Sequence, residues 1–323
     1  MKVLLLDRDG VLNEERDYDY TPGTIRLMPG VVDGLKRLKN WKLFVVSNQS
    51  SVGRGLSTRK NVDACHARLR ELLEKEGIHI ADIVYCPHAP DENCPCRKPK
   101  TGMWEELAAR HDLRAEECVM IGNRDSDIDF ARNIGCAAFR VADARHPMST
   151  PPDACIADMT ELADILLETN RSRVLALSGA VAYSARMRKA GKRIVTTNGA
   201  FDMLHGGHLF LFQEARKHGD VLVIGVNSDA SVRRSKGDGR PVEREEIRAL
   251  KVARHADAVF IFDDDDPREW LKKISPAAHA NAESYGKDCV ESGVLREIGA
   301  KLALIPVRAD LGSTSAILLN CRA

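Results

Sequence analysis

Two carboxylates stand directly after the first apolar run of the chain. The run Val3–Leu6 leads into Asp7-Arg8-Asp9-Gly10, so two acids lie two positions apart at the end of an expected strand. Burying a carboxylate costs free energy unless a cation or a reaction uses it. Alternatively, the same residues could form an Asx turn with Gly10 at the bend, which would have a structural role only. We expect Asp7 and Asp9 to form a pair of acids that does chemistry.

Three further polar groups follow apolar runs in the first half of the chain. Ser47–Ser50 offers hydroxyls and amides, Arg97 and Lys98 are paired cations, and Gly122–Asp127 contains amide and acidic side chains. In open α/β sheets, ligands bind outside the carboxyl ends of the strands. These groups therefore predict a site for a phosphoryl group at one edge of a sheet.

Cysteine and histidine cluster just before the paired cations. Cys86, His88, Cys94 and Cys96 form two tight pairs, Cys-x-His and Cys-x-Cys. Thiolates and imidazole suit tetrahedral Zn²⁺, and four protein ligands leave no open position for catalysis. We expect a structural zinc that clamps the following loop. Buried or unpaired thiols are the alternative.

A second chemical pattern begins near residue 198. Asn198–His208 follows an apolar run and contains His205 and His208, three residues apart, with Gly206 and Gly207 between them. Adjacent glycines allow close backbone approach, and a helix amino terminus attracts phosphate. Imidazoles at this point suit the oxygens of a triphosphate as charge leaves with pyrophosphate. A metal site or a helix cap would give the same pattern.

Alternating strand and helix patterns position these groups. A length of 323 residues predicts two domains, and the βαβ pattern in each half predicts two Rossmann-like parallel sheets, hence an α/β fold. Strands are expected at Val3–Leu6, Lys42–Val46, Ile83–Tyr85, Cys118–Ile121, Ala137–Val141, Ile194–Thr197, Val221–Val226, Ala258–Phe262 and Leu302–Pro306, and helices at Val62–Lys75, Thr101–His111, Met159–Glu168, His208–His218 and Glu243–His255. We place the domains at 1–168 and 191–323, joined by a linker helix over 169–190.

Composition excludes several classes of protein. Lys and Arg number 48 against 47 Asp and Glu, which argues against a nucleic-acid binder. The longest uncharged stretch, Val174–Ala185, falls far short of the roughly 20 apolar residues of a membrane span. The amino terminus reads as a core strand and not as a signal peptide. With nine cysteines, an odd number, metal ligation in a reducing cytoplasm is favoured over disulfides.

The order of motifs over residues 1–145 resembles the haloacid dehalogenase phosphatase superfamily. The cysteine insert followed by Cys96-Arg97-Lys98-Pro99 looks like the branch that holds heptose-1,7-bisphosphate 7-phosphatases and histidinol-phosphate phosphatases. The resemblance implies that Asp7 is the nucleophile, that Asp9 is the acid and base, and that Ser47 and Lys98 hold phosphoryl oxygens. It further implies substrate contacts by Glu15, Arg16, Asp17, Tyr18, Asn48, Gln49, Ser50 and Arg97, and Mg²⁺ held by Asp7, the Asp9 backbone carbonyl, Asn123 and Asp127.

Asn123 departs from that family. Relatives carry Gly-Asp where this chain has Gly122-Asn123, so an amide replaces a carboxylate. An amide oxygen can ligate Mg²⁺ but lacks the charge that a hard cation favours. Asp125 or Asp127 could compensate. We expect a working phosphatase with weakened Mg²⁺ affinity, and the rival is a catalytically poor domain kept as a scaffold.

The second half resembles the cytidylyltransferase-like nucleotidyltransferases, with the signature His-x-Gly-His, and specifically an ADP-heptose synthase domain. The resemblance spans about residues 190–320. It implies nucleotide contacts by Asn198, Gly199, Phe201, Asp202, His205, His208, Lys236, Arg248, Gly312, Ser313, Thr314 and Ser315. A sugar 1-phosphate oxygen would attack the α-phosphorus, with Mg²⁺ neutralising charge. Asn281-Ala282-Glu283 stands where relatives often show Lys-Gly, so adenine is the first expectation for the base, with guanine and cytosine next.

The two resemblances name consecutive steps. Removal of the 7-phosphate from a heptose 1,7-bisphosphate leaves a heptose 1-phosphate, which a nucleotidyltransferase activates with an NTP. The sequence therefore predicts a bifunctional enzyme that makes an NDP-heptose, with ATP as co-substrate, Mg²⁺ and structural Zn²⁺. Its expected partners are sugar phosphates and a second copy of the chain, with neither nucleic acid nor membrane. Histidinol phosphate, and a zinc-stabilised binding module beside an active transferase, are the alternatives.

Overall fold

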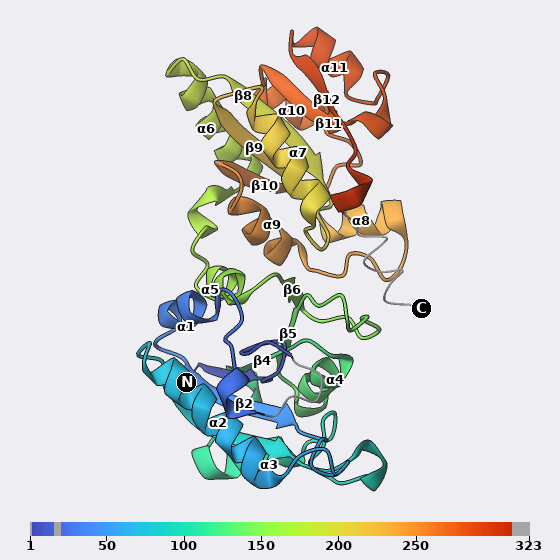
Figure 1. Cartoon of the computed structure of the whole chain (residues 1–323). Helices are drawn as coiled ribbons and strands as arrows, with labels where there is room; N and C mark the ends of the chain where they lie inside the picture. Colours follow the sequence, from blue (N-terminus) through green and yellow to red (C-terminus); the bar gives the residue numbers. More distant parts are fainter. Residues whose placement is uncertain (1, 16–20, 312–323) are drawn as a thin grey trace. The chain divides into compact units, whose positions relative to one another are not determined.

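The computed structural model describes residues 2–15 and 21–311. The chain divides into two compact units, the first ending at Leu167 and the second beginning at Glu168. Each unit is built on one six-stranded sheet with helices around it (Figure 1). All pairings between named strands are parallel. The two expected α/β domains are therefore confirmed.

The first sheet has the order β3-β2-β1-β4-β5-β6. Its strands are β1 (Val3–Leu6), β2 (Lys42–Asn48), β3 (Ile80–Cys86), β4 (Cys118–Gly122), β5 (Ala137–Val141) and β6 (Ala154–Ile156). Val3 pairs with Lys42 on one side and with Cys118 on the other. This register brings the carboxyl ends of β1, β2 and β4 to the same edge. Every residue of β1 is buried, as expected of a central strand covered on both faces.

Five α-helices complete the first unit. They are α1 (Val31–Arg37), α2 (Arg59–Glu74), α3 (Gly102–His111), α4 (Asp125–Ile134) and α5 (Met159–Leu166). The start of α2 is set by Thr58, whose hydroxyl accepts from the backbone N–H of Asn61 at 3.2 Å. Asp158 caps α5 in the same way through the N–H groups of Thr160 and Glu161. Such side chains satisfy donors that the first helical turn leaves free.

The second sheet has the order β12-β11-β8-β9-β10-β7. Its strands are β7 (Val174–Leu175), β8 (Ile194–Gly199), β9 (Val221–Asn227), β10 (Ala258–Phe262), β11 (Ala278–Ala282) and β12 (Lys301–Ile305), and its helices are α6 (Leu177–Lys189), α7 (Gly206–Arg216), α8 (Asp229–Lys236), α9 (Glu245–Ala253), α10 (Arg268–Ile274) and α11 (Ser292–Glu297). Two apolar clusters fill this unit, one of them around Phe212 and the other around Trp270.

Helix α6 differs from the expected linker helix over 169–190. It packs against β10 and α10, and Ala180 is fully buried. Leu177 and Met187 belong to the same apolar cluster as Trp270. The reason is that the uncharged middle of this segment supplies an apolar face, which the sheet of the second unit buries. Residues 177–189 are therefore part of the second domain.

Strand β11 was missed by the sequence analysis. It lies between β12 and β8, so it is interior to the sheet. Its sequence, Ala-His-Ala-Asn-Ala, has no β-branched or aromatic residue and gives no strand signal. The short edge strands β6 and β7 were missed as well. Tertiary pairing, and not local propensity, makes these strands.

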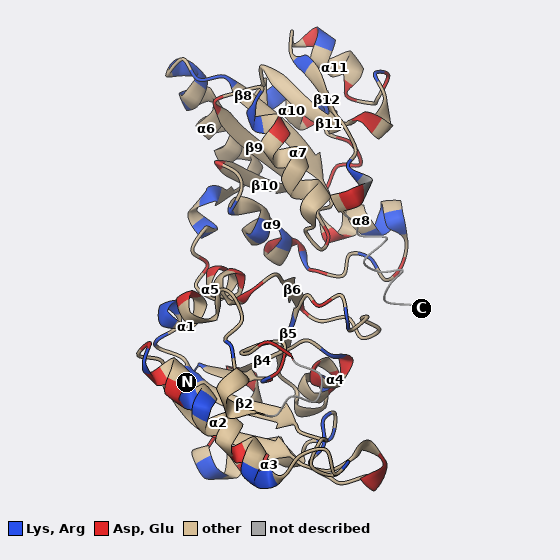
Figure 2. Ribbon diagram, in the orientation of Figure 1, with Lys and Arg blue, Asp and Glu red and all other residues tan. Residues whose placement is uncertain are grey.

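Charged residues of both signs lie mainly on the helices and loops of each unit, and the strands contain few of them (Figure 2). Among the helices of the described residues, none is both long and apolar enough to cross a membrane.

Candidate active sites

The first site lies at the carboxyl edge of the first sheet. Asp7 and Asp9 follow β1, Ser47 lies near the end of β2, and Asp127 is in the first turn of α4, which follows β4. Lys98 comes from the loop between β3 and α3. The four polar groups found in the sequence therefore meet, because the parallel register places those strand ends side by side.

Lys98 lies between two acids of this site, Asp7 and Asp127. Its Nζ lies 2.9 Å from Asp7 Oδ1 and 2.6 Å from Asp127 Oδ1, and it donates to the Val46 carbonyl at 2.6 Å. The residue is only 3% exposed. A buried ammonium needs such partners, because an unpaired charge away from water is costly.

Burial sets the protonation of this group. Burial raises the pKa of Asp7 to about 6; Lys98 opposes the rise, whereas Asp127 and Asp9 add to it. Burial alone would lower the pKa of Lys98, but Asp127 and Asp7 outweigh it and raise the pKa instead. Lys98 therefore stays a cation, and its charge favours the ionised form of Asp7.

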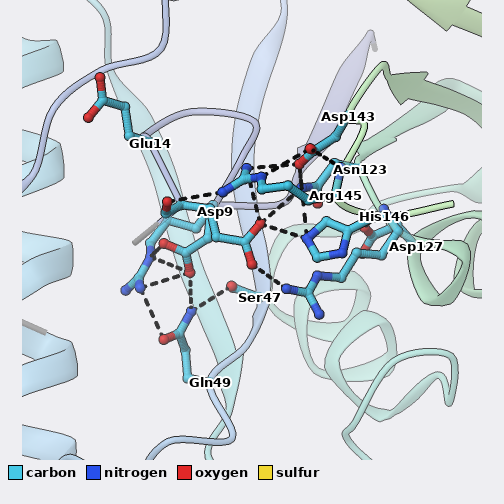
Figure 3. Close-up of polar contacts among 12 residues, drawn as sticks. Asp9, Glu14, Ser47, Gln49, Asn123, Asp127, Asp143, Arg145 and His146 are labelled. Carbon is cyan, nitrogen blue, oxygen red and sulfur yellow. Dashed lines mark hydrogen bonds and ion pairs between the residues drawn. The ribbon is translucent and has the colours of Figure 1, made fainter. Parts of the chain in front are cut away.

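Asp9 sits in a separate network of donors. Its carboxylate lies 2.8 Å from Arg8 Nη2 and accepts from Asn13 Nδ2 at 3.0 Å and from Gln49 Nε2 at 2.9 Å (Figure 3). Burial would raise the pKa of Asp9, but Arg8, Asn13 and Gln49 together hold it below its usual value. The free site therefore favours the ionised form of Asp9, which is the form that accepts a proton from water.

The amides after β2 hold the site together. Asn48 Nδ2 donates to the Lys98 carbonyl at 3.1 Å, and the Lys98 N–H donates to Asn48 Oδ1 at 3.0 Å. Gln49 Nε2 also donates to Ser47 Oγ at 2.9 Å. The resemblance predicts substrate contacts for Asn48 and Gln49. In the structure both side chains also place Lys98, Asp9 and Ser47, and both line the cavity, so their contact with substrate stays a prediction.

These residues line a cavity of about 240 Å³. Its walls include Asp7, Asp9, Ser47, Ser50 and Lys98, as the sequence predicted. Four arginines also reach it: Arg8, Arg54, Arg97 and Arg124. Only Arg97 among them was expected. A polar cavity with convergent cations suits a small anionic substrate.

Asn123 and Asp127 differ in what they leave free for a metal. Asp127 Oδ1 pairs with Lys98, and Asp127 Oδ2 accepts from the Arg124 N–H at 3.1 Å. Asp127 therefore holds Lys98 in place, and its expected role as a Mg²⁺ ligand stays a prediction. Asn123 is fully buried, and its Oδ1 has no hydrogen-bond partner among the described residues. A buried oxygen without a hydrogen-bond partner is usually satisfied by a cation or a water molecule. Asn123 and Asp7 therefore have the oxygen atoms that could hold Mg²⁺.

Glu15 is the centre of a cluster that the sequence did not reveal. Its carboxylate contacts Arg124, lies 2.8 Å from His146 Nε2 and 3.5 Å from Arg145 Nη2. Asp143 pairs with Arg145 at 2.9 Å, and Figure 3 shows Asn123, Asp143, Arg145 and His146 converging. Burial opposes ionisation, but Arg145, and then Asn123, lower the pKa of Asp143 to about 2.

The signal for this cluster was present but unused. Asp143-Ala-Arg145-His146 follows β5, so the rule that polar residues after strands form the site applied here too. Glu15 was expected to contact substrate, and the expected neighbours Arg16, Asp17 and Tyr18 lie outside the described residues.

The cysteines gather as predicted. Cys86 Sγ lies 3.4 Å from Cys94 Sγ, Cys96 Sγ lies 3.5 Å from Cys94 Sγ, and His88 Nδ1 lies 3.2 Å from Cys96 Sγ. All four ligand atoms fall within 4.8 Å of one another. A tetrahedral zinc with Zn–S bonds of about 2.3 Å has sulfur–sulfur edges of roughly 3.8 Å. This Cys₃His set therefore fits zinc, one residue before the Arg97-Lys98 pair.

The second site lies where β8 leads into α7. His205 is the N-cap of α7, and its Nδ1 accepts from the Gly207 N–H at 3.2 Å. The rings of His205 and His208 stack with centroids 3.7 Å apart, and Phe201 meets His208 edge to face. The sequence therefore placed these two imidazoles correctly at one helix amino terminus.

Both imidazoles are neutral near pH 7. Burial lowers the pKa of His208 to about 3, with smaller contributions from His205, Lys236 and Lys251, and burial also lowers the pKa of His205. Because His205 Nδ1 accepts a hydrogen bond, its proton sits on Nε2. His208 Nδ1 is buried without a partner among the described residues. The pair can therefore offer hydrogen bonds without bringing a formal charge.

Asp202 and Arg248 support the site from within. Asp202 is 1% exposed, accepts from the N–H groups of Val242 and Glu243 at 3.0 Å, and pairs with Arg240 at 2.6 Å. Arg248 is fully buried and donates to the Glu243 carbonyl, the Ala200 carbonyl and Asp229. The resemblance predicts nucleotide contacts for both. In the structure these side chains join the loop after β8 to the loop after α8, and their contact with a nucleotide stays a prediction.

The remaining residues that were predicted to bind the nucleotide lie in three kinds of place. Asn198 and Gly199 end β8, and Lys236 is exposed at the end of α8. Phe201 is buried in the core beside Phe212. Gly312, Ser313, Thr314 and Ser315 lie outside the described residues.

Family models match both halves of the chain. Residues 95–162 match the HAD-hydrolase-like model, and residues 196–309 match the cytidylyltransferase-like model. The matches fall in the first and second units respectively.

Individual relatives agree. The chain is 41% identical over 138 residues to the D-glycero-beta-D-manno-heptose-1,7-bisphosphate 7-phosphatase of Pseudomonas putida, which covers 42% of this chain and 79% of that protein. It is 42% identical over 137 residues to the bifunctional protein HldE of Streptomyces coelicolor, covering 42% of this chain but only 30% of that longer protein.

Among solved structures, the D,D-heptose 1,7-bisphosphate phosphatase of B. bronchiseptica, complexed with magnesium and phosphate, is 31% identical with a TM-score of 0.47. The similarity covers 52% of this chain and 99% of that one. Family and geometry together show a phosphatase and a nucleotidyltransferase in one chain. The chain belongs, through its first domain, to the HAD-like heptose bisphosphate 7-phosphatase family, and it joins to that domain a cytidylyltransferase-like one.

Proposed function

We propose that the chain removes the 7-phosphate of D-glycero-D-manno-heptose 1,7-bisphosphate and then transfers a nucleotidyl group, AMP from ATP, to the resulting heptose 1-phosphate. The products are NDP-heptose, phosphate and pyrophosphate. The observation that carries this proposal is the buried contact of Lys98 with Asp7 and Asp127 in one domain of a chain whose other domain is cytidylyltransferase-like.

In the first step, an Asp7 oxygen attacks the phosphorus, and the bond from phosphorus to the sugar oxygen breaks. Asp9 gives a proton to the leaving alkoxide. A water then attacks the aspartyl-phosphate, Asp9 takes its proton, and phosphate leaves as Asp7 is regenerated. Lys98 and Ser47 lie where they can hold the phosphoryl oxygens. Bound Mg²⁺, held by Asp7, the Asp9 backbone carbonyl and Asn123, would reduce repulsion between carboxylate and phosphate.

The network around Asp9 favours one of the two forms that this step needs. Arg8, Asn13 and Gln49 stabilise the carboxylate, which is the base needed for the second half. For the first half, Asp9 takes up a proton from solvent when the anionic substrate binds, because the negative charge of the substrate raises the pKa of this carboxyl. Arg97, Arg54 and Arg124 on the cavity wall suit the rest of that substrate.

In the second step, an oxygen of the sugar 1-phosphate attacks the α-phosphorus of the nucleotide, and the bond to the bridging oxygen of pyrophosphate breaks. The Nε2–H of His205 and the stacked His208 would donate to the triphosphate oxygens, and Lys236 would neutralise charge. Catalysis is by orientation and hydrogen bonding, and no covalent intermediate forms on the protein.

We propose Zn²⁺ in the Cys₃His cluster as a structural ion. The cluster leads directly into Arg97 and Lys98, so the ion would fix the loop that delivers both cations. Its thiols must stay reduced to bind metal, which suits a reducing compartment such as the cytoplasm.

A specific observation favours a second candidate function. Asn123 supplies an uncharged ligand in place of the carboxylate expected for this family, so the first domain could serve as a scaffold beside an active transferase. The buried Lys98–Asp7 contact argues for the active enzyme, because it keeps the acid, the cation and the cavity together.

The proposal is tested by incubating the protein with the bisphosphate, Mg²⁺ and each NTP in turn, while phosphate and pyrophosphate are measured separately. We expect phosphate without any NTP, and pyrophosphate only with the correct NTP, ATP first. Pyrophosphate from heptose 1-phosphate with no phosphate from the bisphosphate at any Mg²⁺ concentration would establish the scaffold instead.

A further inference from the structure

Asn123 is held at one end only. Its Nδ2 donates to Asp143 Oδ2 at 3.1 Å and to Glu15 Oε2 at 3.4 Å, whereas its Oδ1 has no partner among the described residues. Carboxylates accept hydrogen bonds and donate none. Rotating the side-chain amide by half a turn would bring Oδ1 close to both carboxylates, where it would be repelled. The two acids therefore determine the positions of Nδ2 and Oδ1.

The two acids are themselves fixed. Asp143 receives Arg145 Nε at 3.1 Å, Arg145 Nη2 at 2.9 Å and the Arg145 N–H at 3.0 Å. Glu15 is contacted by Arg124 and by His146. Neither acid is free to turn away, and their charges are already matched by the arginines beside them.

Asn123 also packs against the loop that carries the catalytic acids. A Cβ added at Gly10 would lie 2.2 Å from Asn123 Nδ2, so the amide lies against the Gly10 backbone, one residue beyond Asp9. The amide is fully buried there. Asn123 therefore packs directly against the loop that carries Asp7 and Asp9, and its burial restricts rotation of the amide.

We infer that Glu15 and Asp143 are positioning residues that hold the Asn123 nitrogen and so leave its oxygen as the ligand for a divalent cation. This rests on the proposed phosphatase function only in naming Mg²⁺. It has an unexpected consequence for position 123. An aspartate there would place a third carboxylate at hydrogen-bond distance from two others, with no proton between them.

We therefore do not expect a carboxylate at position 123 alone to improve the Mg²⁺ site. Asn123→Asp replaces two hydrogen bonds by repulsion, and a buried charge left without a partner is strongly unfavourable. Exchanging the groups, Asn123→Asp with Asp143→Asn, restores a donor opposite the acid. The effect of the residue at position 123 on stability and on Mg²⁺ binding therefore depends on its neighbour Asp143.

The test is a cycle of four proteins: the parent, Asn123→Asp, Asp143→Asn and the double variant. Two quantities are measured for each full-length chain, the melting temperature without metal and the affinity for Mg²⁺ by calorimetry. Asn40→Asp, at an exposed position, controls for an added carboxylate.

We expect Asn123→Asp to lower the melting temperature of the first unit by about 5 °C or more and to change Mg²⁺ affinity by less than about threefold. Asp143→Asn alone should weaken Mg²⁺ binding by about threefold or more, because the amide loses its orientation. The double variant should regain most of the melting temperature and bind Mg²⁺ about tenfold more tightly than the parent.

Additive effects around the cycle would overturn the inference, as would an Asn123→Asp protein as stable as the parent that binds Mg²⁺ as tightly as the double variant. If Asn123→Asp does not fold, the Mg²⁺ affinity of Asp143→Asn still decides, and an unchanged affinity refutes the inference. Neither readout needs substrate. A coupled cycle in a protein that releases no phosphate would therefore refute the proposed function alone.

Discussion

The first unit gathers formal charges at the end of its sheet, whereas the second gathers neutral rings. Lys98 lies between Asp7 and Asp127 in the first, and His205 stacks on His208 at a helix amino terminus in the second. Both sites lie at the carboxyl ends of parallel strands. The difference suits the chemistry that we propose, because a covalent nucleophile needs an ionised acid and a means to stabilise it.

The residues that hold the two sites in position also differ between the two units. In the first unit, Gln49 and Asn48 hold the reactive groups directly. In the second, Asp202 and Arg248 hydrogen-bond to the backbone of the loops around the site. A site that makes a covalent bond fixes individual atoms. A site that orients a nucleotide can instead fix the loops around it.

Replacing Asp7 should give the largest separation of the two activities. Asp7→Asn removes the nucleophile, so phosphate release should fall by about 10³-fold or more. Pyrophosphate release from heptose 1-phosphate should stay at the parent rate. Asp112→Asn, at an exposed position, is the matched control. Phosphate release close to the parent rate would rule out Asp7 as the nucleophile.

The reverse separation should come from His208. His208→Ala removes a donor to the triphosphate, and we expect nucleotidyl transfer to fall about 10²- to 10³-fold. Phosphate release from the bisphosphate should not change. His218→Ala, at the other end of the same helical segment, serves as control. Equal losses for the two histidines would place the chemistry elsewhere.

Loss of the zinc cluster should affect the first unit alone. Cys94→Ser, or chelation, removes the clamp on the Arg97–Lys98 loop, so the melting temperature of the first unit should fall by about 5 °C or more and phosphate release should fall with it. Cys289→Ser in the second unit is the control. The prediction fails if the purified protein holds no zinc and Cys94→Ser behaves like Cys289→Ser.

Acid should weaken the second unit through its buried histidines. Burial lowers the folded-state pKa of His208 and of His279 to about 3, against about 6.5 in the unfolded chain. The unfolded state therefore binds more protons below pH 6.5, and the free energy of unfolding decreases as the pH falls from there. Denaturant titrations at pH 7 and pH 5 should show a smaller decrease for His208→Gln. The same decrease in variant and parent would exclude His208 as a source.

Sequence reasoning found the residues that lie at the ends of the strands better than the residues that hold them in position. Asp7, Asp9, Lys98, His205 and His208 stood out because their types and spacing follow strand ends. The positions of Asp143 and Asp202 depend on contacts between segments far apart in the chain. Strand β11 was hidden for the same reason, since Ala-His-Ala-Asn-Ala becomes a strand only between β8 and β12.

The burial of Arg248 shows the limit most clearly. The resemblance placed it on a nucleotide, because its position in the chain matches a motif. In the structure its guanidinium donates to two carbonyls and to Asp229 inside the fold, and its contact with a nucleotide stays a prediction. A pattern of residue types gives the position of an arginine but not the direction in which it points.

The order of the two reactions tests the account most directly. Asp7→Asn is supplied with ATP, Mg²⁺ and either heptose 1-phosphate or heptose 1,7-bisphosphate, and pyrophosphate is measured over time. We predict pyrophosphate at the parent rate from the 1-phosphate and almost none from the bisphosphate. Pyrophosphate at the parent rate from the bisphosphate would contradict the account, because the second site would then need no product from the first.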